Sequence, residues 1–595
     1  MSSKTVRIGG ASGFWGDASL ATPQLLAEGD LDYIVYDYLA EITMSIMARA
    51  RAKSADAGFA ADFVLSALKR NLKEIARQKV KIISNAGGVN PQACAAAVRS
   101  LVADLGLNLT VAVVEGDDLL DRAAEIADRN PCEMFSGEAF PDPASIASIN
   151  AYLGAFPIAR ALDEGADIVI TGRCVDSAVT LGACIHEFGW GAEHLDELAG
   201  GSLAGHILEC GPQACGGNFT DWELVADTIE EIGYPISDIS ADGSFAVTKP
   251  KDAGGVVSIG TVCEQMLYEI GDPQSYVLPD VVCDFSGVKV EQVAENRVQV
   301  SGAVGRSAPD AYKVCMTHQD GYRGGHVFAY YGIDADRKAQ RFADAAVARA
   351  RNILKSMNAA DFTETSIEII GAESQFGPAK CIDGSREVAV KIAARHPDQA
   401  GIAILLREAT GLALSSPPGL SGFAGARPKP SPVMRLFSFE LPKSEIHISV
   451  STDGSGEHFM DIAGVPLNAA AIERPEPPAV PKDAADFTEV PLIQLAWGRS
   501  GDKGDKANIG IIARKPAYVP YIWSALTETV VAEQFGHFLK GDVERYYLPG
   551  SNAVNFVLND VLGGGGVASL RSDPQGKGYA QVLLTYPVSV PRALL

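Results

Sequence analysis

The sequence lacks the marks of several specialised classes of protein. None of its ten cysteines forms a CxxC pair, so we expect buried, reduced thiols and no disulfide framework or structural zinc site. No run approaches the roughly 18 apolar residues that span a bilayer, and no basic start followed by an apolar stretch indicates a signal peptide. We therefore expect a cytoplasmic protein that does not bind a membrane.

Positive charge is also scarce. The 595 residues include 50 Lys and Arg against 74 Asp and Glu, which gives a formal net charge of −24. So acidic a chain repels the phosphate backbone, and nucleic acid is therefore not an expected partner. A local basic pocket for an anionic small molecule stays open. The 47% hydrophobic and 21% charged residues are typical of a globular protein, and the length allows several domains.

The first third of the chain alternates predicted strands with predicted helices. Short apolar runs predict strands at residues 6–8, 33–36, 80–83, 109–114 and 168–170. Asn90 is a favourable N-cap and Pro91 a favourable first helical residue, so a helix should begin there. Alternation of this kind predicts an α/β fold with a mainly parallel sheet.

A proline-rich segment divides the rest of the chain. Residues 473–482 (ERPEPPAVPK) favour an extended linker, because proline cannot continue a helix. We assign residues 1–200 to an α/β region with Gly-rich loops and residues 201–470 to an α+β region. Residues 471–489 form the linker, and residues 490–595 form a small α+β domain of ferredoxin-like size.

Polar residues follow the predicted strands, and this is the edge of a parallel sheet at which ligands bind. The candidate substrate-binding residues there are Gly13, Trp15, Gly16, Asn85, Gly87, Gly88, Arg173 and Asp176, and Asp37 is a candidate catalytic residue. Arg173 with Asp176 three residues later suits a clamp for a carboxylate or phosphate. Each residue has a structural alternative: tight turns for Asn85 and the glycines, a helix cap for Asp37, and a local ion pair for Arg173.

The first Gly-rich loop, residues 9–13 (GGASG), resembles a turn that cradles phosphate. It lacks the GxGxxG spacing of a dinucleotide site and the lysine of a P-loop. We therefore expect no tightly bound nicotinamide or flavin.

The sharpest local combination of side chains is residues 206–210 (HILEC). At helical spacing His206 and Glu209 share a face, and together they can act as a general acid and base. Cys210 is either a nucleophile or a buried thiol. Two ligands do not make a metal site, so we predict none.

The last domain carries a polar loop, residues 497–508, between two predicted strands. Its basic residues Arg499, Lys503 and Lys506 alternate with acids and glycines and are candidates for binding an anion. The alternatives are a self-neutralised surface turn and a docking loop.

Taken together, these segments resemble the acyclic terpene utilisation protein A family. The matching stretches are residues 9–17, 37–41, 85–91, 170–178, 205–219 and 498–508, which cover motifs along almost the whole chain. The resemblance implies a large α/β part, completed by residues 201–470, and a C-terminal ferredoxin-like domain. It also implies bacterial catabolism of acyclic terpenes such as citronellol and geraniol, alongside enzymes of branched acyl-CoA thioesters. It provides no catalytic residue.

Three functions are consistent with these observations. The favoured one is an enzyme, of lyase or hydratase type, acting on an acyl-CoA or a related branched carboxylic acid. The alternatives are a non-catalytic subunit or scaffold of an acyl-CoA carboxylase or hydratase complex, and a ligand-binding regulator. Coenzyme A, as part of the substrate, is the only cofactor group expected. As further partners we expect a second copy of the chain and other enzymes of acyl-CoA metabolism.

Overall fold

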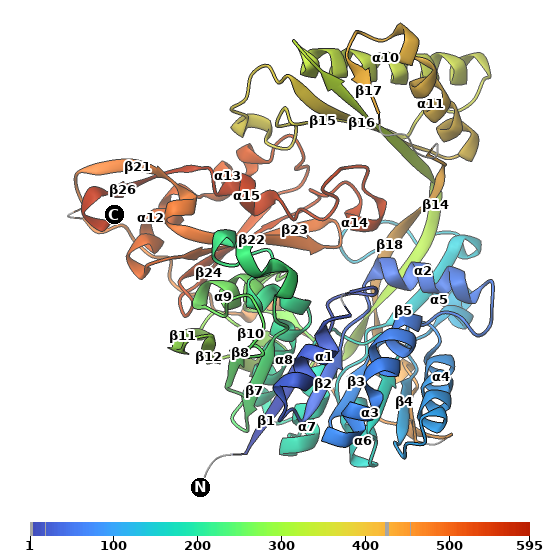
Figure 1. Cartoon of the computed structure of the whole chain (residues 1–595), viewed down its shortest axis with the longest axis vertical. Coiled ribbons are helices and arrows are strands. Elements are labelled where there is room, and N and C mark those ends of the chain that lie inside the picture. The colour runs from blue at the N-terminus through green and yellow to red at the C-terminus, as the bar shows by residue number, and fades with distance from the viewer. Residues whose placement is uncertain (1–3, 18, 423–427, 453, 483) are drawn as a thin grey trace.

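A mixed sheet organises the lower part of the molecule (Figure 1). The computed structural model describes residues 4–17, 19–422, 428–452, 454–482 and 484–595. Within these residues eleven strands form one sheet, in the order β11 (Lys289–Ala294), β12 (Arg297–Ser301), β8 (Phe245–Thr248), β7 (Ile236–Ser240), β1 (Thr5–Gly10), β2 (Tyr33–Tyr36), β3 (Lys81–Ser84), β6 (Ile168–Thr171), β4 (Val111–Glu115), β19 (Ile448–Thr452) and β20 (Ser455–Phe459).

The α/β class is confirmed, but the expectation of a mainly parallel sheet is wrong. In the described residues the central strands β1, β2, β3, β6 and β4 pair in parallel, and the flanking pairs are antiparallel. Helical crossovers connect the central strands, whereas β7–β8, β11–β12 and β19–β20 are hairpins, and a short connection forces its strands to run antiparallel. The alternating pattern of strands and helices is confined to the first third of the chain. The hairpins come later in the chain, so the pattern does not include them.

Helices cover both faces of the central strands. One face carries α1 (Ala21–Glu28), α3 (Lys69–Gln78) and α4 (Pro91–Asp104), and the other carries α6 (Phe156–Asp163), α7 (Ala178–Phe188) and α8 (Leu195–Leu208). Alternate residues of a strand point to opposite faces, so Ile82 packs in the first layer and Ile83 in the second. The predicted start of α4 is confirmed, because the Asn90 side chain accepts from the Ala93 N–H. No helix in the described part of the chain is both long and apolar enough to cross a membrane.

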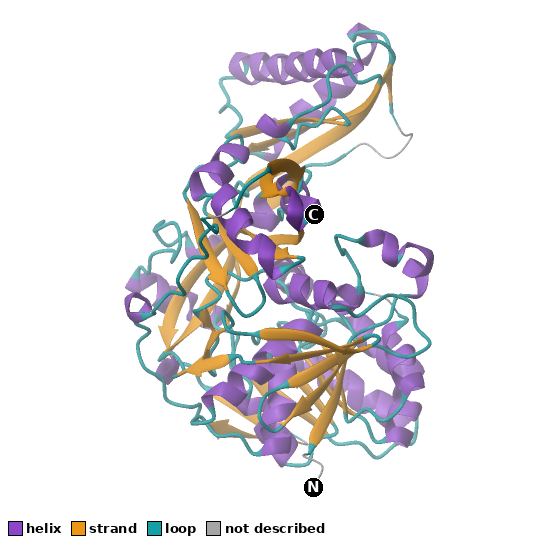
Figure 2. Cartoon of the chain, turned by 90° about the vertical axis from the view of Figure 1, so that its left-hand side faces the viewer, coloured by secondary structure: helices purple, strands orange, loops and turns teal. Residues whose placement is uncertain are grey.

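One strand of 21 residues connects the lower part to an upper module. At about 3.3 Å per residue, β14 (Ala311–Tyr331) extends roughly 70 Å. Its first half pairs with β5 (Ile146–Ala151) and β18 (Ser431–Pro442), and its second half pairs with β16 (Glu387–His396) and β17 (Leu420–Ser421). The upper sheet also contains β15 (Glu364–Ile370), and α10 (Ala335–Ser356) and α11 (Gln399–Gly411) cover it with a separate core (Figure 2).

The C-terminal residues form a domain around their own core, between the lower part and the upper module (Figure 1). Its antiparallel sheet has the order β22 (Ala496–Lys503), β23 (Lys506–Ala513), β25 (Ala553–Leu558) and β24 (Val543–Leu548). Its helices are α12 (Val519–Ala525), α13 (Glu528–Gln534), α14 (Gly565–Ala568) and α15 (Tyr579–Leu583), and β21 (Phe487–Pro491) pairs with β26 (Pro587–Pro591). The segment predicted as a polar loop at 497–508 is therefore mostly a β-hairpin.

Polar contacts hold this domain to its neighbours. Asn508 donates to the Leu267 carbonyl at 2.6 Å, at the end of α9 (Ile259–Leu267), and Arg514 pairs with Asp221. On the other side, Arg323 of β14 donates to the Ser569 carbonyl at 3.0 Å, directly after α14. The three parts therefore enclose a common space.

Candidate functional site

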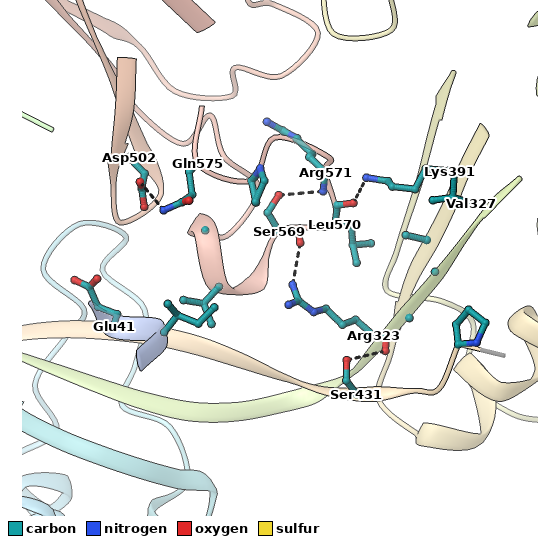
Figure 3. Close-up of a pocket in the computed structure, with 18 of the residues that line it drawn as sticks. Glu41, Arg323, Val327, Lys391, Ser431, Asp502, Ser569, Leu570, Arg571 and Gln575 are labelled. Atoms are coloured by element: carbon teal, nitrogen blue, oxygen red, sulfur yellow. Dashed lines mark hydrogen bonds between the residues drawn. The ribbon is translucent and has the colours of Figure 1, made fainter. Parts of the chain in front are cut away.

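A cavity of about 1290 Å³ lies where the three parts meet. The lower part contributes residues 39–42, Arg173 and Asp176, and the upper module contributes residues 323–328 and Lys391. The C-terminal domain contributes residues 502–504, 566–567, 569–571, 574 and 575. In Figure 3, Glu41 and Asp502 lie at one end of the cavity, and Lys391 and Arg571 lie at the other.

The lining of this cavity is basic, although the chain as a whole is acidic. Seven of the described lining residues are Lys or Arg and four are Asp or Glu: Arg173, Lys313, Arg323, Lys391, Lys429, Lys503 and Arg571, against Glu41, Asp176, Glu269 and Asp502. The cavity lining therefore has three more cationic than anionic residues, whereas the whole chain has a net charge of −24. A concave site with walls of low dielectric strengthens such a local field, so the cavity attracts anions.

Arg173 is held rigidly at the lower end of the cavity. It follows β6, and its side chain is 4% exposed. Nη1 donates to Asp176 Oδ1 at 2.7 Å and to the Leu39 carbonyl at 3.0 Å, and the guanidinium stacks on Tyr152 at 4.1 Å. No described residue accepts a hydrogen bond from Nε. A guanidinium held rigidly at the cavity lining can bind an anion without much loss of side-chain entropy.

Glu41, the first residue of α2 (Glu41–Arg51), remains ionised beside Arg173. Burial alone raises the pKa of this carboxyl group, but Lys313 and Arg173 outweigh burial and bring the pKa to about 2. Tyr152 also donates to Glu41 Oε1 at 2.8 Å. The lower end of the cavity therefore holds an ordered network of charges.

Asp37 and Asn85 lie buried beneath this network, outside the cavity lining. The Asn85 side chain accepts from the Tyr38 N–H at 2.8 Å and donates to Asp37 Oδ1. Burial and the negative charge of Asp176 raise the pKa of Asp37 well above its usual range. The pair holds together the loops that follow β2 and β3.

His206 and Glu209 form the predicted pair at the end of α8. Their Nδ1 and Oε1 atoms are 2.8 Å apart, and their side chains are 1% and 7% exposed. Burial and Lys503 lower the pKa of His206 to about 4, whereas burial and Asp176 raise the pKa of Glu209 well above its usual range. His206 is therefore neutral at pH 7. Both side chains lie behind the cavity wall and not in the lining.

Two family models match the chain. The model described as acyclic terpene utilisation family protein AtuA matches residues 6–452, and the AtuA ferredoxin-like domain model matches residues 490–589. The chain belongs to the AtuA family. No curated protein and no solved structure matches it.

The two matched segments of this AtuA family chain both contribute to the cavity. Arg173 and Asp176 come from the first, and Lys503 comes from the turn of the β22–β23 hairpin in the second. Of the residues that the sequence analysis selected, these three line the cavity. Within the described residues, no group of three or more His, Cys, Asp or Glu is arranged to hold a metal ion.

The structure places the selected glycines outside the cavity, in close packing or at exposed turns. A side chain on Gly13 would come within 2.7 Å of the Cys210 backbone, and one on Gly87 within 2.4 Å of the Thr171 carbonyl. Gly88 has a φ of +56°, which favours glycine, and contacts Met47. Gly16 and the half-buried Trp15 likewise lie outside the lining.

The two other basic residues of the hairpin also point away from the cavity. Arg499 stacks on Tyr268 at 4.6 Å and donates to Gln213, and Lys506 lies 5.2 Å from the centre of the Phe135 ring. Cys210 is half-buried, and this burial together with the charge of Glu209 raises the pKa of its thiol well above the usual value. Cys210 is therefore not a thiolate nucleophile at neutral pH.

Reasoning from the sequence missed most of the cavity lining. The cations of the upper module, Arg323 and Lys391, lie on the face of β14 and β16 opposite the helices. Alternation of Lys391 with the core residues Val390 and Ile392 shows only that Lys391 leaves the core. That Lys391 faces a cavity follows only from the pairing of β16 with β14, two strands that are far apart in the sequence.

Because Gly87 packs against backbone, Gly87→Ala is expected to destabilise the protein. The new methyl group overlaps the Thr171 carbonyl, and overpacking of this kind costs about 1–3 kcal/mol. Thermal unfolding measures the loss. Gly411→Ala is the matched control, since nothing lies within 4 Å of its added methyl group. Equal melting temperatures for the two variants would contradict the close packing of Gly87.

Proposed function

We propose that this AtuA family chain is a catabolic enzyme that acts on an acyl-CoA or a related branched carboxylic acid, by lyase or hydratase chemistry. Its setting is the degradation of terpenes or related compounds. The observation that supports this most directly is the basic cavity in an acidic chain. Coenzyme A enters as part of the substrate, and we propose no other cofactor.

The size of the cavity suits a large anionic ligand. Pockets for drug-sized molecules measure roughly 300–1,000 Å³, and this cavity measures about 1290 Å³. A CoA thioester combines several phosphate charges with a long neutral arm and an acyl group, so it needs cations at one end of a deep site.

We assign the phosphates to the upper end of the cavity. Arg323 has no carboxylate within 4.0 Å among the described residues. Burial and the nearby cation Arg395 both lower the pKa of Arg323. An Arg beside a like charge and without an acid partner is a natural site for phosphate. The acyl group then lies at the lower end, beside Arg173, Glu41 and Lys503.

The buried residues have supporting roles in this proposal. His206 and Glu209 hold the end of α8 against the lower end of the cavity, and Asp37 and Asn85 hold the loops beside Arg173. Asp176 fixes the Arg173 guanidinium through the 2.7 Å hydrogen bond.

Binding and turnover by the purified chain test the proposal. Calorimetry with a branched acyl-CoA, free CoA and the matching free acid is expected to rank the thioester first, because the thioester contacts both ends. The affinity is expected to fall as salt rises, since the contacts are ionic. Mass spectrometry of the same mixtures detects turnover.

The outcomes separate the three functions. Failure of all three compounds to bind contradicts a CoA site. Turnover only after addition of a carboxylase or hydratase contradicts an independent enzyme and favours the subunit. Binding without turnover in either setting favours a regulator.

A further inference from the structure

Glu269 has an unusual backbone conformation at the edge of the cavity. It follows α9 and has a φ of +59°, in the left-handed region that non-glycine residues rarely adopt. Its N–H donates to Asn508 Oδ1 at 2.9 Å, and Asn508 is buried in the sheet of the C-terminal domain. A strained residue persists only where its surroundings hold it, and such residues cluster at functional sites.

This conformation turns the Glu269 side chain toward the cavity, where it is part of the lining. Its Oε1 lies 3.2 Å from Lys577 Nζ, and the side chain is 27% exposed. Burial raises the pKa of Glu269 to about 7 against the opposing attraction of Lys503. A carboxyl group with a pKa near the working pH exchanges protons efficiently.

The charged and titratable groups that face Glu269 come from all the surrounding elements. They are Glu41, Asp176, His206, Glu209 and Cys210 from the lower part, and Arg499, Asp502, Lys503 and Lys577 from the C-terminal domain.

Lys503 provides a fixed positive charge beside this carboxyl group. Its ammonium lies 5.4 Å from the centre of the Tyr276 ring, and no carboxylate of the described residues lies within 4.0 Å of it. Burial lowers the pKa of Lys503, but Tyr276 and Glu269 outweigh burial, so the group stays charged. A buried ammonium without a close acid partner can stabilise an oxyanion.

We propose that Glu269 removes and returns a proton at the carbon next to the carbonyl group of the bound acyl thioester, and that Lys503 stabilises the resulting enolate. The C–H bond breaks, its proton passes to a Glu269 oxygen, and its electron pair moves into the enolate, which places negative charge on the carbonyl oxygen. The reverse step restores the C–H bond, so no oxidant or further reactant is required. This role rests on the proposed function and adds the group that moves the proton.

Exchange of hydrogen for deuterium tests this step without any net reaction. In D₂O, 3-methylbutanoyl-CoA incubated with the full chain should gain deuterium at the carbon next to the carbonyl group, as measured by mass spectrometry. This saturated thioester carries no leaving group at the next carbon, so elimination does not interfere. The exchange rate should rise as pH increases through about 7, because the carboxylate is the active base.

Glu269→Gln should slow exchange by at least about 100-fold, whereas the Kd of the thioester should stay near the wild-type value. Glu264→Gln is the matched control. Glu264 lies in α9, five residues before Glu269. Burial likewise raises the pKa of Glu264 to about 7, but its carboxylate accepts from the Thr220 N–H and is not in the cavity lining. The Glu264→Gln variant should therefore exchange hydrogen for deuterium at the wild-type rate. Glu269→Gly relieves the left-handed strain, so it should fold and still lose exchange.

Wild-type exchange rates in Glu269→Gln or Glu269→Gly overturn the role of Glu269. Binding of the thioester by the wild-type chain without exchange overturns this role and leaves the proposed binding function intact. Absence of binding overturns both.

Discussion

Arg173→Met is expected to reduce the affinity for the branched free acid, whose carboxylate takes the place beside Arg173, by roughly 30-fold to several thousand-fold. Met has a similar length, but it removes the planar fork that stacks on Tyr152 and that Asp176 and the Leu39 carbonyl hold in place. It also leaves Glu41 without one of the two cations that keep it ionised. Calorimetry with the free acid measures the change in Kd.

Two further variants show whether the loss of affinity is specific to Arg173 and whether it depends on the fork or on the charge. Arg77→Met removes an Arg that is 69% exposed and pairs with Glu74 three residues away, and surface pairs contribute little, so its affinity should match wild type. Arg173→Lys keeps the charge without the fork and should fall between wild type and Met. If Arg173→Met binds the free acid as tightly as wild type while remaining folded by circular dichroism, Arg173 is only a structural ion pair.

His206→Gln is expected to lower turnover by up to about 100-fold while the Kd of the substrate changes little. His206 lies behind the cavity wall, so its loss does not remove a contact of the kind that Arg173 makes. The imidazole ring of His206 lies 5.9 Å from the Tyr276 ring, measured between ring centres, and Gln does not replace this ring. The substitution therefore alters the packing that supports the lower end of the cavity. Steady-state and binding measurements on one preparation separate the two effects.

A second histidine provides the control for this variant. His186 on α7 also pairs with a carboxylate, that of Asp163 at 2.6 Å, but it lies outside the cavity, so His186→Gln should keep its turnover. Glu209→Gln should lose less than His206→Gln, because Gln has nearly the same shape as Glu and keeps a polar partner for Nδ1. A rise in Kd without a fall in turnover for His206→Gln would contradict the supporting role.

Much of the lower part could be predicted because its signals are local. The runs at 33–36 and 168–170 are apolar and short, and they form β2 and β6. Asn90 and Pro91 begin α4 as predicted, since a cap depends on a few adjacent residues. The same logic placed Arg173 after its strand and beside Asp176, three residues away.

The glycine loops show where local reasoning reached its limit. Glycine permits close approach of backbone to an anion or to protein, and the sequence does not distinguish the two. The structure does: the backbone of Cys210, after the end of α8, fills the space beside Gly13, and the carbonyl of Thr171 fills the space beside Gly87.

By itself the sequence determined the α/β character of the first third, the C-terminal ferredoxin-like domain and the membership of the AtuA family. Tertiary structure alone decided the direction of the outer strands and the location of the cavity. Local periodicity records which face of an element is apolar, whereas β14 pairs with strands more than a hundred residues away in the chain. The pairing of β14 and the packing of the C-terminal domain bring Arg323, Glu269 and Lys503 to one cavity. Strand registry and domain packing depend on contacts between residues far apart in the chain, and no short window of sequence contains those contacts.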